Sequence, residues 1–246
     1  MNDFSLEIEH LYYAYPDKFQ ALKDINLKLK KGDSLGIVGA NGAGKSTLLL
    51  QLCGILLPTK GIIKVENLIM NKENLGKIRK ILGFVFQNPE NQLFTTSIYE
   101  DVSFGPKNYK LSKEEVDKKA IDALKKVGIE HLKDRAPYRL SGGQQNLAAI
   151  ATAIVMDPSI LIMDEPSAAL DPKARRRLIN LLNDFDYTKI IASHDLDLIL
   201  DTCNKTIVLK EGTIIKSGDT KDILLNEELM ESCDLELPLS AQKIRI

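Results

Sequence analysis

The fold of this chain is decided by residues 39–46, Gly39-Ala40-Asn41-Gly42-Ala43-Gly44-Lys45-Ser46. They match the pattern G-x-x-x-x-G-K-[ST] of a phosphate-binding loop, whose glycines let backbone N–H groups wrap around a polyphosphate. The apolar run 34–38 predicts a buried parallel strand before the loop, and residues 46–52 predict a helix after it. This strand–loop–helix context favours a genuine phosphate site over a chance glycine-rich turn.

The end of this loop predicts a site for a polyphosphate and Mg²⁺. Lys45 is expected to reach the β- and γ-phosphates, and Ser46 is expected to hold the metal ion. The loop backbone, continuing into Thr47, is expected to surround the phosphates at a helix N-terminus.

Composition argues against several classes of protein. The 246 residues carry 33 basic and 34 acidic side chains, whereas a nucleic-acid binder usually has a basic surplus. The three cysteines, Cys53, Cys203 and Cys233, have no C-x-x-C spacing, so we expect reduced thiols in a cytosolic protein. No apolar stretch approaches the roughly 18 residues of a spanning helix, and the first residues lack the features of a signal peptide. A role at a membrane would therefore need a partner that spans it.

Short apolar strands alternate with helices along the chain, which predicts an α/β fold with a parallel core. The expected strands have continuous or alternating apolar residues. The first strand-like region is 6–29, which a turn at 15–17 interrupts, and further strands are expected at 61–65, 82–86, 160–163 and 189–192. A hairpin is expected at 206–216. Helices are expected from the capping box at 112–115 to 127 and behind Asp171-Pro172 at 173–182. Residues 88–157 contain few strand signals and predict a helical insert.

The strand predicted at 160–163 ends in two acidic residues, Asp164 and Glu165. Ligand chemistry in parallel α/β sheets collects at the carboxyl ends of strands. Asp164 is expected to bind Mg²⁺, directly or through water, and Glu165 to polarise the attacking water as general base. Strands often end in acidic residues, so the pair alone is a weak signal for a site. Together with the phosphate-binding loop it becomes a strong one.

Three further motifs carry a resemblance to a known family. They are Leu140-Ser141-Gly142-Gly143-Gln144 at the start of a helix, Gln87 after the strand at 82–86, and His194 within Ala192-Ser193-His194-Asp195. In this order, with Asp171 shortly after Glu165, the chain resembles the nucleotide-binding subunit of an ABC transporter over residues 6–222. The resemblance implies a P-loop ATPase with a RecA-like parallel-sheet core, an antiparallel β subdomain and a helical insert. It assigns 1–225 to the ATPase domain, about 88–157 to the helical subdomain and 226–246 to a short appendage.

The LSGGQ motif predicts a second anion site. Ser141, Gly142 and Gly143, followed by Gln144, present bare N–H groups at a helix N-terminus. The resemblance implies that this site faces the γ-phosphate bound by the opposite subunit of a head-to-tail dimer with two ATP molecules at its interface. Asp171 is implied to link the two sites across the dimer.

The resemblance assigns roles to three further side chains. Gln87 is implied to sense the γ-phosphate, to bind Mg²⁺ and to couple both to the helical insert. His194 is implied to contact the γ-phosphate and to hold the attacking water in register with Glu165. Tyr15 matches the aromatic that stacks on adenine, although a turn aromatic within the cluster at 12–15 is the alternative.

The chain departs from the family at two positions after the LSGGQ motif. Leu147 and Thr152 stand where arginines are usual. We expect catalysis to survive these changes, since every residue expected at the phosphates is present, while the rate or its coupling could be altered.

Two segments resemble a narrower group, the ATPases of energy-coupling-factor importers, which take up cobalt, nickel or vitamins. They are Gln87-Asn88-Pro89-Glu90-Asn91-Gln92-Leu93-Phe94 and Tyr99-Glu100-Asp101-Val102-Ser103-Phe104-Gly105-Pro106, with a weaker likeness at 235–238. The segment after Gln87 is implied to face a coupling helix of the membrane subunit. Expected partners are a second ATPase subunit, identical or different, an integral membrane subunit and a membrane solute-binding subunit, with no nucleic acid. The expected location is the cytoplasmic face of the membrane.

Two other functions remain as alternatives. A soluble ABC-type ATPase acting on nucleic acid or ribosomes usually has long coiled coils or two fused cassettes, and the near-neutral charge disfavours it. A regulatory subunit that binds ATP without turnover is disfavoured by the presence of Glu165 and His194.

Overall fold

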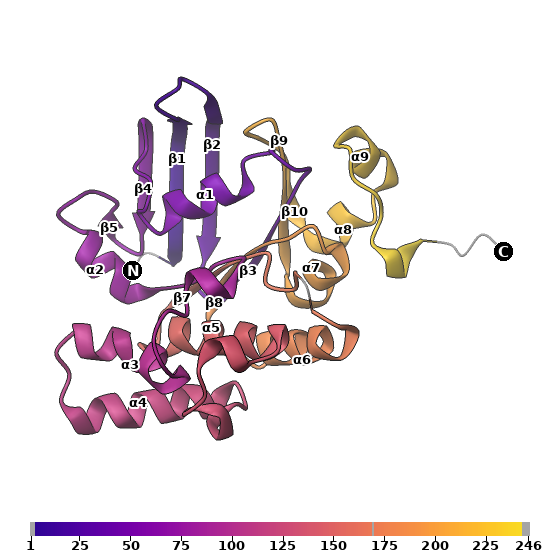
Figure 1. Cartoon of the computed structure of the whole chain (residues 1–246). Coiled ribbons are helices and arrows are strands. Elements are labelled where there is room, and N and C mark those ends of the chain that lie inside the picture. The colour runs from indigo at the N-terminus through magenta and orange to yellow at the C-terminus, as the bar shows by residue number, and fades with distance from the viewer. Residues whose placement is uncertain (1–2, 169, 243–246) are drawn as a thin grey trace. The chain divides into compact units, whose positions relative to one another are not determined.

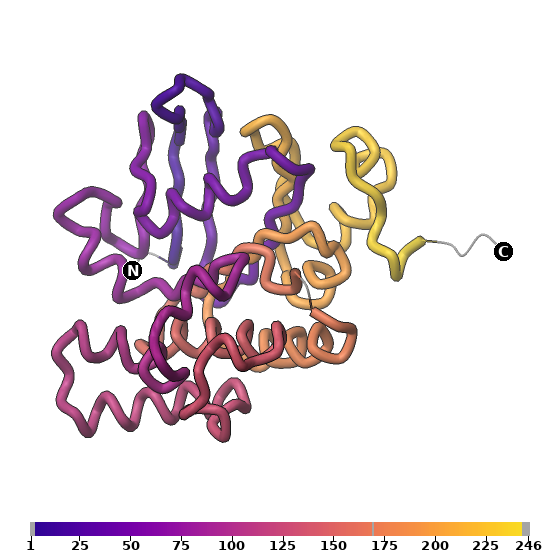
Figure 2. Tube along the Cα trace, in the orientation of Figure 1, coloured from indigo at the N-terminus to yellow at the C-terminus, as the bar shows by residue number. Residues whose placement is uncertain are grey.

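The computed structural model describes residues 3–168 and 170–242, which form two compact units. Of the described residues, unit 1 comprises 3–79 and 186–242, and unit 2 comprises 80–168 and 170–185. The tube in Figure 2 follows the chain from indigo and purple in unit 1, through magenta in unit 2, and back into unit 1 in orange and yellow.

Unit 1 contains an antiparallel sheet formed by the first strands of the chain. Its strands are β1 (Phe4–Ala14), β2 (Gln20–Lys30), β4 (Lys60–Val65) and β5 (Leu68–Ile69), in the order β2-β1-β4-β5 (Figure 1). In β2 the apolar residues Ile25, Leu27 and Leu29 are buried, and the polar residues between them are exposed. The alternation predicts this burial because successive side chains of a strand point to opposite faces, and the predicted antiparallel strands are confirmed.

The second set of strands in unit 1 is mainly parallel. Strand β3 (Ser34–Val38) pairs in parallel with β8 (Thr188–Ala192) and β9 (Lys205–Lys210), and β10 (Thr213–Asp219) returns antiparallel to β9. Every residue of β3 and β8 is buried, as expected for strands covered on both faces. The predicted strands and the predicted hairpin are confirmed.

Helices of unit 1 follow these strands. They are α1 (Lys45–Leu52), α7 (Leu196–Thr202), α8 (Thr220–Leu224) and α9 (Glu227–Ser232), while α2 (Leu75–Ile81) contains the unit boundary. The last described turn, η4 (Leu239–Ala241), is held by Asp197 of α7, whose carboxylate accepts hydrogen bonds from the N–H groups of Leu239 at 3.0 Å and Ser240 at 3.1 Å. The described end of the chain is thus held to α7 by specific hydrogen bonds.

The described residues of unit 2 after α2 form two parallel strands and four helices. Strand β6 (Leu82–Val85) pairs with β7 (Ile160–Asp164), and the helices are α3 (Ile98–Asn108), α4 (Lys113–Lys126), α5 (Gly142–Ile154) and α6 (Pro172–Asn183). Three short 3₁₀ turns lie between them, η1 (Pro89–Asn91), η2 (Glu130–Leu132) and η3 (Pro137–Arg139). Residues 88–157, all of them described, contain helices and turns but no strand.

Local sequence signals explain where two of these helices begin. Ser112 accepts a hydrogen bond from the N–H of Glu115, whose side chain returns one to Ser112, so the predicted capping box starts α4. Asp171 accepts hydrogen bonds from the N–H groups of Lys173 and Ala174 and caps α6. Both starts depend only on neighbouring residues, and both predictions are confirmed.

Strand β6 and helix α5 approach closely at a glycine. A Cβ atom on Gly83 would lie 2.5 Å from the carbonyl oxygen of Ala153, a distance that real Cβ atoms do not adopt. Glycine at this position therefore lets the strand that leads to Gln87 pack directly on the helix that begins at the LSGGQ motif.

The three cysteines are free and buried. Burial raises the pKa of the Cys53 thiol to about 11 and that of Cys203 to about 12, so both are protonated at neutral pH. Among the helices of residues 3–168 and 170–242, none has both the length and the apolar character needed to cross a bilayer.

Asp33 is a carboxylate on whose charge the stability of unit 1 depends. It accepts hydrogen bonds from the N–H of Lys30 at 2.9 Å, from Nζ of Lys205 at 2.6 Å and from Nδ2 of Asn204 at 3.3 Å. Burial opposes its ionisation, but these hydrogen bonds and the charge of Lys205 outweigh burial and hold the pKa of Asp33 below its ordinary value.

Asp33→Asn is expected to lower the free energy of unfolding by about 1–2 kcal/mol at pH 7, because the charged acceptor is lost. A carboxyl group with a lowered folded-state pKa stabilises the protein above its unfolded pKa of about 3.9 and loses this effect as the pH falls through the folded-state value. Urea denaturation should therefore show the same difference in unfolding free energy between the parental protein and Asp33→Asn at pH 7 and pH 5. The difference should be smaller at pH 3.5. The exposed Asp222→Asn is the control, and a pH-independent difference would contradict the assignment.

Candidate functional site

The predicted phosphate-binding loop lies between β3 and α1 in unit 1, in the strand–loop–helix arrangement expected from the sequence. Gly42 and Gly44 have φ values of 79° and 105°, in the region that favours glycine. A Cβ atom on Gly44 would lie 2.9 Å from the carbonyl oxygen of Ala21, so the loop can reach the helix only with glycine at this position. The backbone shape is that of a cradle for an anion at a helix N-terminus.

Lys45 folds its side chain back over this loop. Its Nζ donates to the carbonyl oxygens of Gly39 at 2.7 Å and Ala40 at 3.3 Å, and the residue is 8% exposed. A buried ammonium group inside a glycine-rich loop is complementary to a polyphosphate. The loop therefore fits the phosphate groups of a nucleotide.

Tyr15 is brought to the helix that follows the loop. Its hydroxyl lies 3.0 Å from Oγ1 of Thr47, and its ring packs edge-on against Tyr13 with 5.0 Å between ring centroids. The side chain is half-buried. A tyrosine at the side of the phosphate-binding helix has the position expected of an aromatic that stacks on a base, and stacking itself stays a prediction.

His194 follows β8, the strand that pairs with β3. The register places Ala192 opposite Ile37, so the carboxyl ends of these two parallel strands meet at one edge of the sheet. His194 is exposed, and it precedes α7, whose first turn is capped by Asp195 through the N–H of Leu198 at 2.9 Å. Unit 1 therefore presents the phosphate-binding loop and His194 from neighbouring strands.

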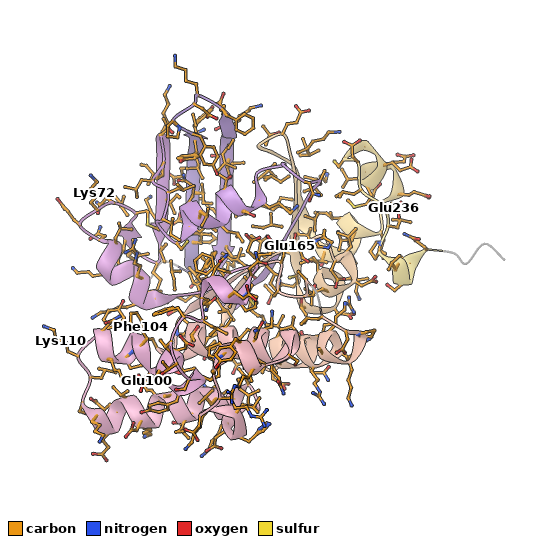
Figure 3. All side chains as sticks on the ribbon, in the orientation of Figure 1. Lys72, Glu100, Phe104, Lys110, Glu165 and Glu236 are labelled. Carbon is orange, nitrogen blue, oxygen red and sulfur yellow. The ribbon has the colours of Figure 1, made fainter. Side chains whose placement is uncertain are left out.

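Unit 2 presents the remaining predicted groups from its own pair of parallel strands. The register places Val85 of β6 opposite Met163 of β7, so Gln87 and the Asp164–Glu165 pair follow strands that end at the same edge. Gln87 is exposed, whereas Asp164 and Glu165 are 9% and 8% exposed. Glu165, labelled in Figure 3, directly follows β7.

The backbone of Glu165 has an unusual conformation. Its φ is 49°, in the left-handed region that non-glycine residues rarely adopt, and Pro166 follows it. The side-chain amide of Asn146 donates to the carbonyl oxygen of Pro166 at 2.8 Å in a buried setting. Through this hydrogen bond, helix α5 holds the turn that follows β7. Backbone strain that persists at such a turn is typical of functional sites. No local sequence signal marks Asn146 as part of the site, because its partner lies 20 residues away.

The LSGGQ motif forms the beginning of α5. Ser141 accepts a hydrogen bond from the N–H of Gln144 at 3.4 Å, and the Gln144 side chain accepts one from the N–H of Ser141 at 3.0 Å. Gly142 and Gly143 form the first turn, and a Cβ on Gly143 would lie 3.1 Å from Cβ of Ala174 in α6. The helix N-terminus and the Asp171 cap of α6 line a hollow of about 140 Å³. The LSGGQ motif thus lies at a capped helix start, while anion binding there and a role across a dimer stay predictions.

The residues predicted to bind Mg²⁺ supply oxygen donors of suitable kinds. Ser46 offers a hydroxyl, Gln87 an amide carbonyl and Asp164 a carboxylate. In the described part of the chain, no group of three or more His, Cys, Asp or Glu side chains forms an all-protein metal cage. Mg²⁺ with a nucleotide needs only one or two carboxylates besides phosphate oxygens and water, so this donor set fits the ion.

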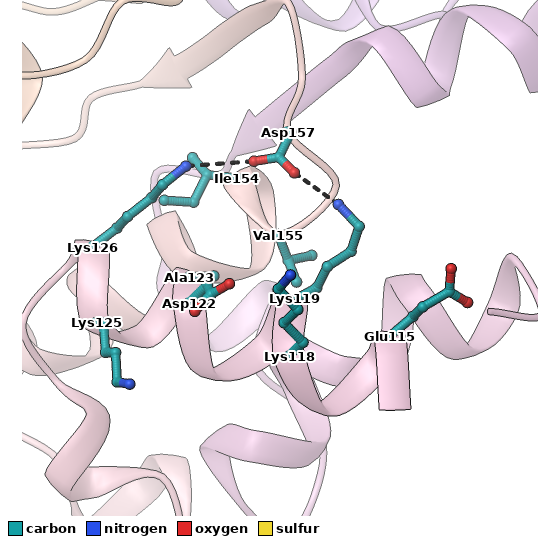
Figure 4. Close-up of a pocket in the computed structure, with 10 residues that line it drawn as sticks. All are labelled: Glu115, Lys118, Lys119, Asp122, Ala123, Lys125, Lys126, Ile154, Val155 and Asp157. Carbon is teal, nitrogen blue, oxygen red and sulfur yellow. Dashed lines mark hydrogen bonds and ion pairs between the residues drawn. The ribbon is translucent and has the colours of Figure 1, made fainter. Parts of the chain in front are cut away.

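A second hollow in unit 2 contains none of the predicted site residues. It has a volume of about 550 Å³ and lies on the lysine-rich face of α4 (Figure 4). The carboxylate of Asp157 is shared by Lys119 at 2.7 Å and Lys126 at 3.4 Å. The hollow is therefore lined by an ion-pair network in which one carboxylate pairs with two lysines.

Comparison with known proteins identifies relatives along almost the whole chain. The profile of the ABC transporter family matches residues 22–168. A putative ABC transporter ATP-binding protein of Geobacter sulfurreducens is 47% identical over 242 residues, which cover 98% of this chain and 97% of that protein. An energy-coupling factor transporter ATP-binding protein of Methanocaldococcus jannaschii is 43% identical over 99% of this chain and 89% of its own length.

Solved structures agree with these matches. The cbiO1 protein of Clostridium perfringens, described as part of the ABC transporter complex cbiONQ, superposes with a TM-score of 0.84 and 42% identity and covers 98% of both chains. An ATP-binding cassette solved as a dimer with ADP and Pi superposes with a TM-score of 0.79 and 30% identity over 87% of this chain and 98% of its own. Their shared fold is the α/β fold of ABC ATPases.

Proposed function

The chain belongs to the ABC transporter family of ATP-binding subunits, and from that premise we propose that it hydrolyses ATP to drive an energy-coupling-factor importer. The observation that carries the importer proposal is the 43% identity to an energy-coupling factor ATP-binding protein along 99% of the chain. The segments at 87–94 and 99–106, whose sequences resemble that group, support the same assignment.

In the proposed reaction, the loop at 39–46 and Lys45 bind the phosphates of ATP. Glu165 accepts a proton from the attacking water while the water oxygen bonds to the γ-phosphorus. The bond between the γ-phosphorus and the oxygen of the leaving ADP breaks, and ADP and phosphate are released. His194 holds that water and contacts the γ-phosphate. Ser46, Gln87 and Asp164 are the residues that would hold Mg²⁺, which would neutralise charge on the phosphates when bound.

The working form that we propose is a head-to-tail dimer. The start of α5 offers the N–H groups of Gly142 and Gly143 to an anion, and this second anion site is separate in sequence from the phosphate-binding loop. A related cassette solved as a dimer with ADP and Pi supports this arrangement. Closing on ATP and reopening after hydrolysis would move the helices of unit 2 and transmit force to a membrane partner.

An exposed aromatic pair in unit 2 supports the contact with that partner. Phe94 and Phe104 are 65% and 44% exposed, and their rings pack edge-on with centroids 5.0 Å apart (Figure 3 labels Phe104). Asp101 accepts hydrogen bonds at 3.0 Å from the N–H groups of Phe94 and Thr95, so the aromatic pair is held against α3. An apolar surface close to Gln87 in sequence suits the coupling helix of a membrane subunit.

The proposed transport is uptake of cobalt, nickel or a vitamin, with the chain acting as a peripheral subunit at the cytoplasmic face of the membrane. Its proposed partners are a second ATPase subunit, an integral membrane subunit and a membrane solute-binding subunit. The cbiO1 relative, described as part of a cbiONQ complex, supports such an assembly.

The test is affinity purification of the tagged full chain from its native membranes in mild detergent, followed by identification of co-purifying proteins. We expect a polytopic membrane protein and a small membrane solute-binding protein. The double variant Phe94→Ser/Phe104→Ser should lose both while retaining ATP binding, because the aromatic pair is remote in sequence from the phosphate-binding loop. Recovery of ribosomal or DNA-associated proteins instead would overturn the importer proposal in favour of the soluble class of ABC ATPase.

A further inference from the structure

The side chain of Gln92 holds the end of strand β6. Its Oε1 accepts a hydrogen bond from the N–H of Phe86 at 3.1 Å, and its Nε2 donates to the carbonyl oxygen of Phe84 at 3.2 Å. Because Gln87 directly follows Phe86, these bonds fix the base of the segment that carries Gln87.

The same amide also reaches the LSGGQ helix, α5. Nε2 of Gln92 lies 2.8 Å from the carbonyl oxygen of Ala149 and 2.6 Å from Oγ1 of Thr152, and because the amide has two N–H groups for three acceptors, at least one N–H is shared. The Thr152 hydroxyl in turn donates to the Ala149 carbonyl oxygen at 2.8 Å. The hydroxyl therefore accepts from Gln92 and donates to the helix backbone, and one side chain connects β6 to α5.

Helix α5 carries a second such connection. Asn146 is buried, and its amide donates to the carbonyl oxygen of Pro166, the residue after Glu165. Gln92 joins α5 to the strand that leads to Gln87, and Asn146 joins α5 to the turn that carries Glu165. Hydrogen bonds in partly buried settings resist displacement because an unpaired polar group there is costly.

We propose that Gln92 is a positioning residue for ATP hydrolysis, which links the Gln87 segment to the LSGGQ helix so that the two move together. The proposal rests on the proposed ATPase function and deepens it by naming the side chain that couples the two motifs within one subunit. The Gln92 amide is bonded to β6 and α5, and Gln92 is not among the residues proposed to bind nucleotide or metal, so we expect its effect to be on turnover and not on nucleotide affinity.

The test compares steady-state ATP hydrolysis by the full chain, purified with its co-purifying partners, in parental and variant forms. Gln92→Met keeps the length of the side chain but removes its hydrogen bonds. We expect kcat to fall by about tenfold, which is less than the roughly hundredfold loss of rate that a small misplacement of reacting groups can cause. KM for ATP should change less than twofold. Ser112→Ala is the control, because it removes the hydrogen bond that caps α4 elsewhere in unit 2, and we expect it to leave kcat unchanged.

A double-mutant cycle with Thr152→Val separates the link from a general effect on folding. Thr152→Val alone should lower kcat several-fold, and the double variant should be no slower than Gln92→Met, because both changes remove the same connection. Thermal unfolding of each variant is measured in parallel.

The outcomes distinguish this inference from the proposed function. If the parental protein does not hydrolyse ATP, the proposed function fails. If the parental protein is active, the role of Gln92 is overturned when kcat of Gln92→Met stays within twofold of the parental value. It is also overturned when a rise in KM accounts for the whole loss of kcat/KM. A third contradicting result is a double variant whose loss of kcat is the product of the losses in Gln92→Met and Thr152→Val.

Discussion

Glu165→Gln is expected to lower the rate of ATP hydrolysis by about 10²–10⁴-fold and to leave ATP binding intact, because an amide cannot accept the proton of the attacking water. Glutamine has nearly the same shape as glutamate, so the left-handed backbone at residue 165 and the hydrogen bond from Asn146 to Pro166 should persist. With ATP bound and not consumed, we expect the variant to accumulate as a closed dimer.

Phosphate release and size-exclusion chromatography with ATP and Mg²⁺ measure these two effects. The chain contains a matched control: Glu211 also has a φ of 49°, but it is exposed in the β9–β10 hairpin. Glu211→Gln should hydrolyse ATP at the parental rate. If Glu165→Gln also does so, Glu165 is not the general base.

Lys45→Ala is expected to weaken ATP binding by roughly a hundredfold, since removing one partner of a desolvated charge pair costs several kcal/mol. Lys45 is 8% exposed, and its Nζ lies within 2.7 Å of the Gly39 carbonyl oxygen, so the ammonium group is held inside the loop that would surround the phosphates. Unlike Glu165→Gln, this variant should fail at the binding step and form no ATP-dependent dimer.

Isothermal titration with ATP and Mg²⁺ measures the affinity, and the ATP-induced rise in melting temperature gives an independent measure. Lys72→Ala is the control, because Lys72 is an exposed lysine of the same unit (Figure 3). Parental affinity in Lys45→Ala would show that nucleotide does not bind at this loop.

Much of the fold was predictable because it depends on neighbouring residues. The glycine-rich loop between an apolar run and a helix, the capping box at Ser112 and the cap at Asp171 all form within a few residues, and the structure contains each of them. Alternating or continuous apolar residues likewise distinguish the antiparallel strand β2 from the fully buried strands β3 and β8.

The departure at Thr152 shows where sequence reasoning stops. The sequence marks only that a usual arginine is missing, whereas the structure shows the Thr152 hydroxyl accepting a hydrogen bond from Gln92, 60 residues away. An arginine side chain has donors and no acceptor, so it could not replace the threonine in this contact. Partner choice of this kind depends on how β6 packs against α5, which no local pattern encodes.

Short stretches of sequence therefore suffice to predict the candidate reactive groups: a loop for phosphates, acidic residues after a buried strand and a glycine-rich helix start, since each motif carries its groups in adjacent positions. How these groups are held depends on tertiary packing. The contacts of Tyr15 with Thr47, Asn146 with Pro166 and Gln92 with α5 join residues 20 to 60 positions apart. Such contacts form only when strands and helices pack, because a hydrogen bond between distant side chains requires the backbone to bring them within about 3 Å.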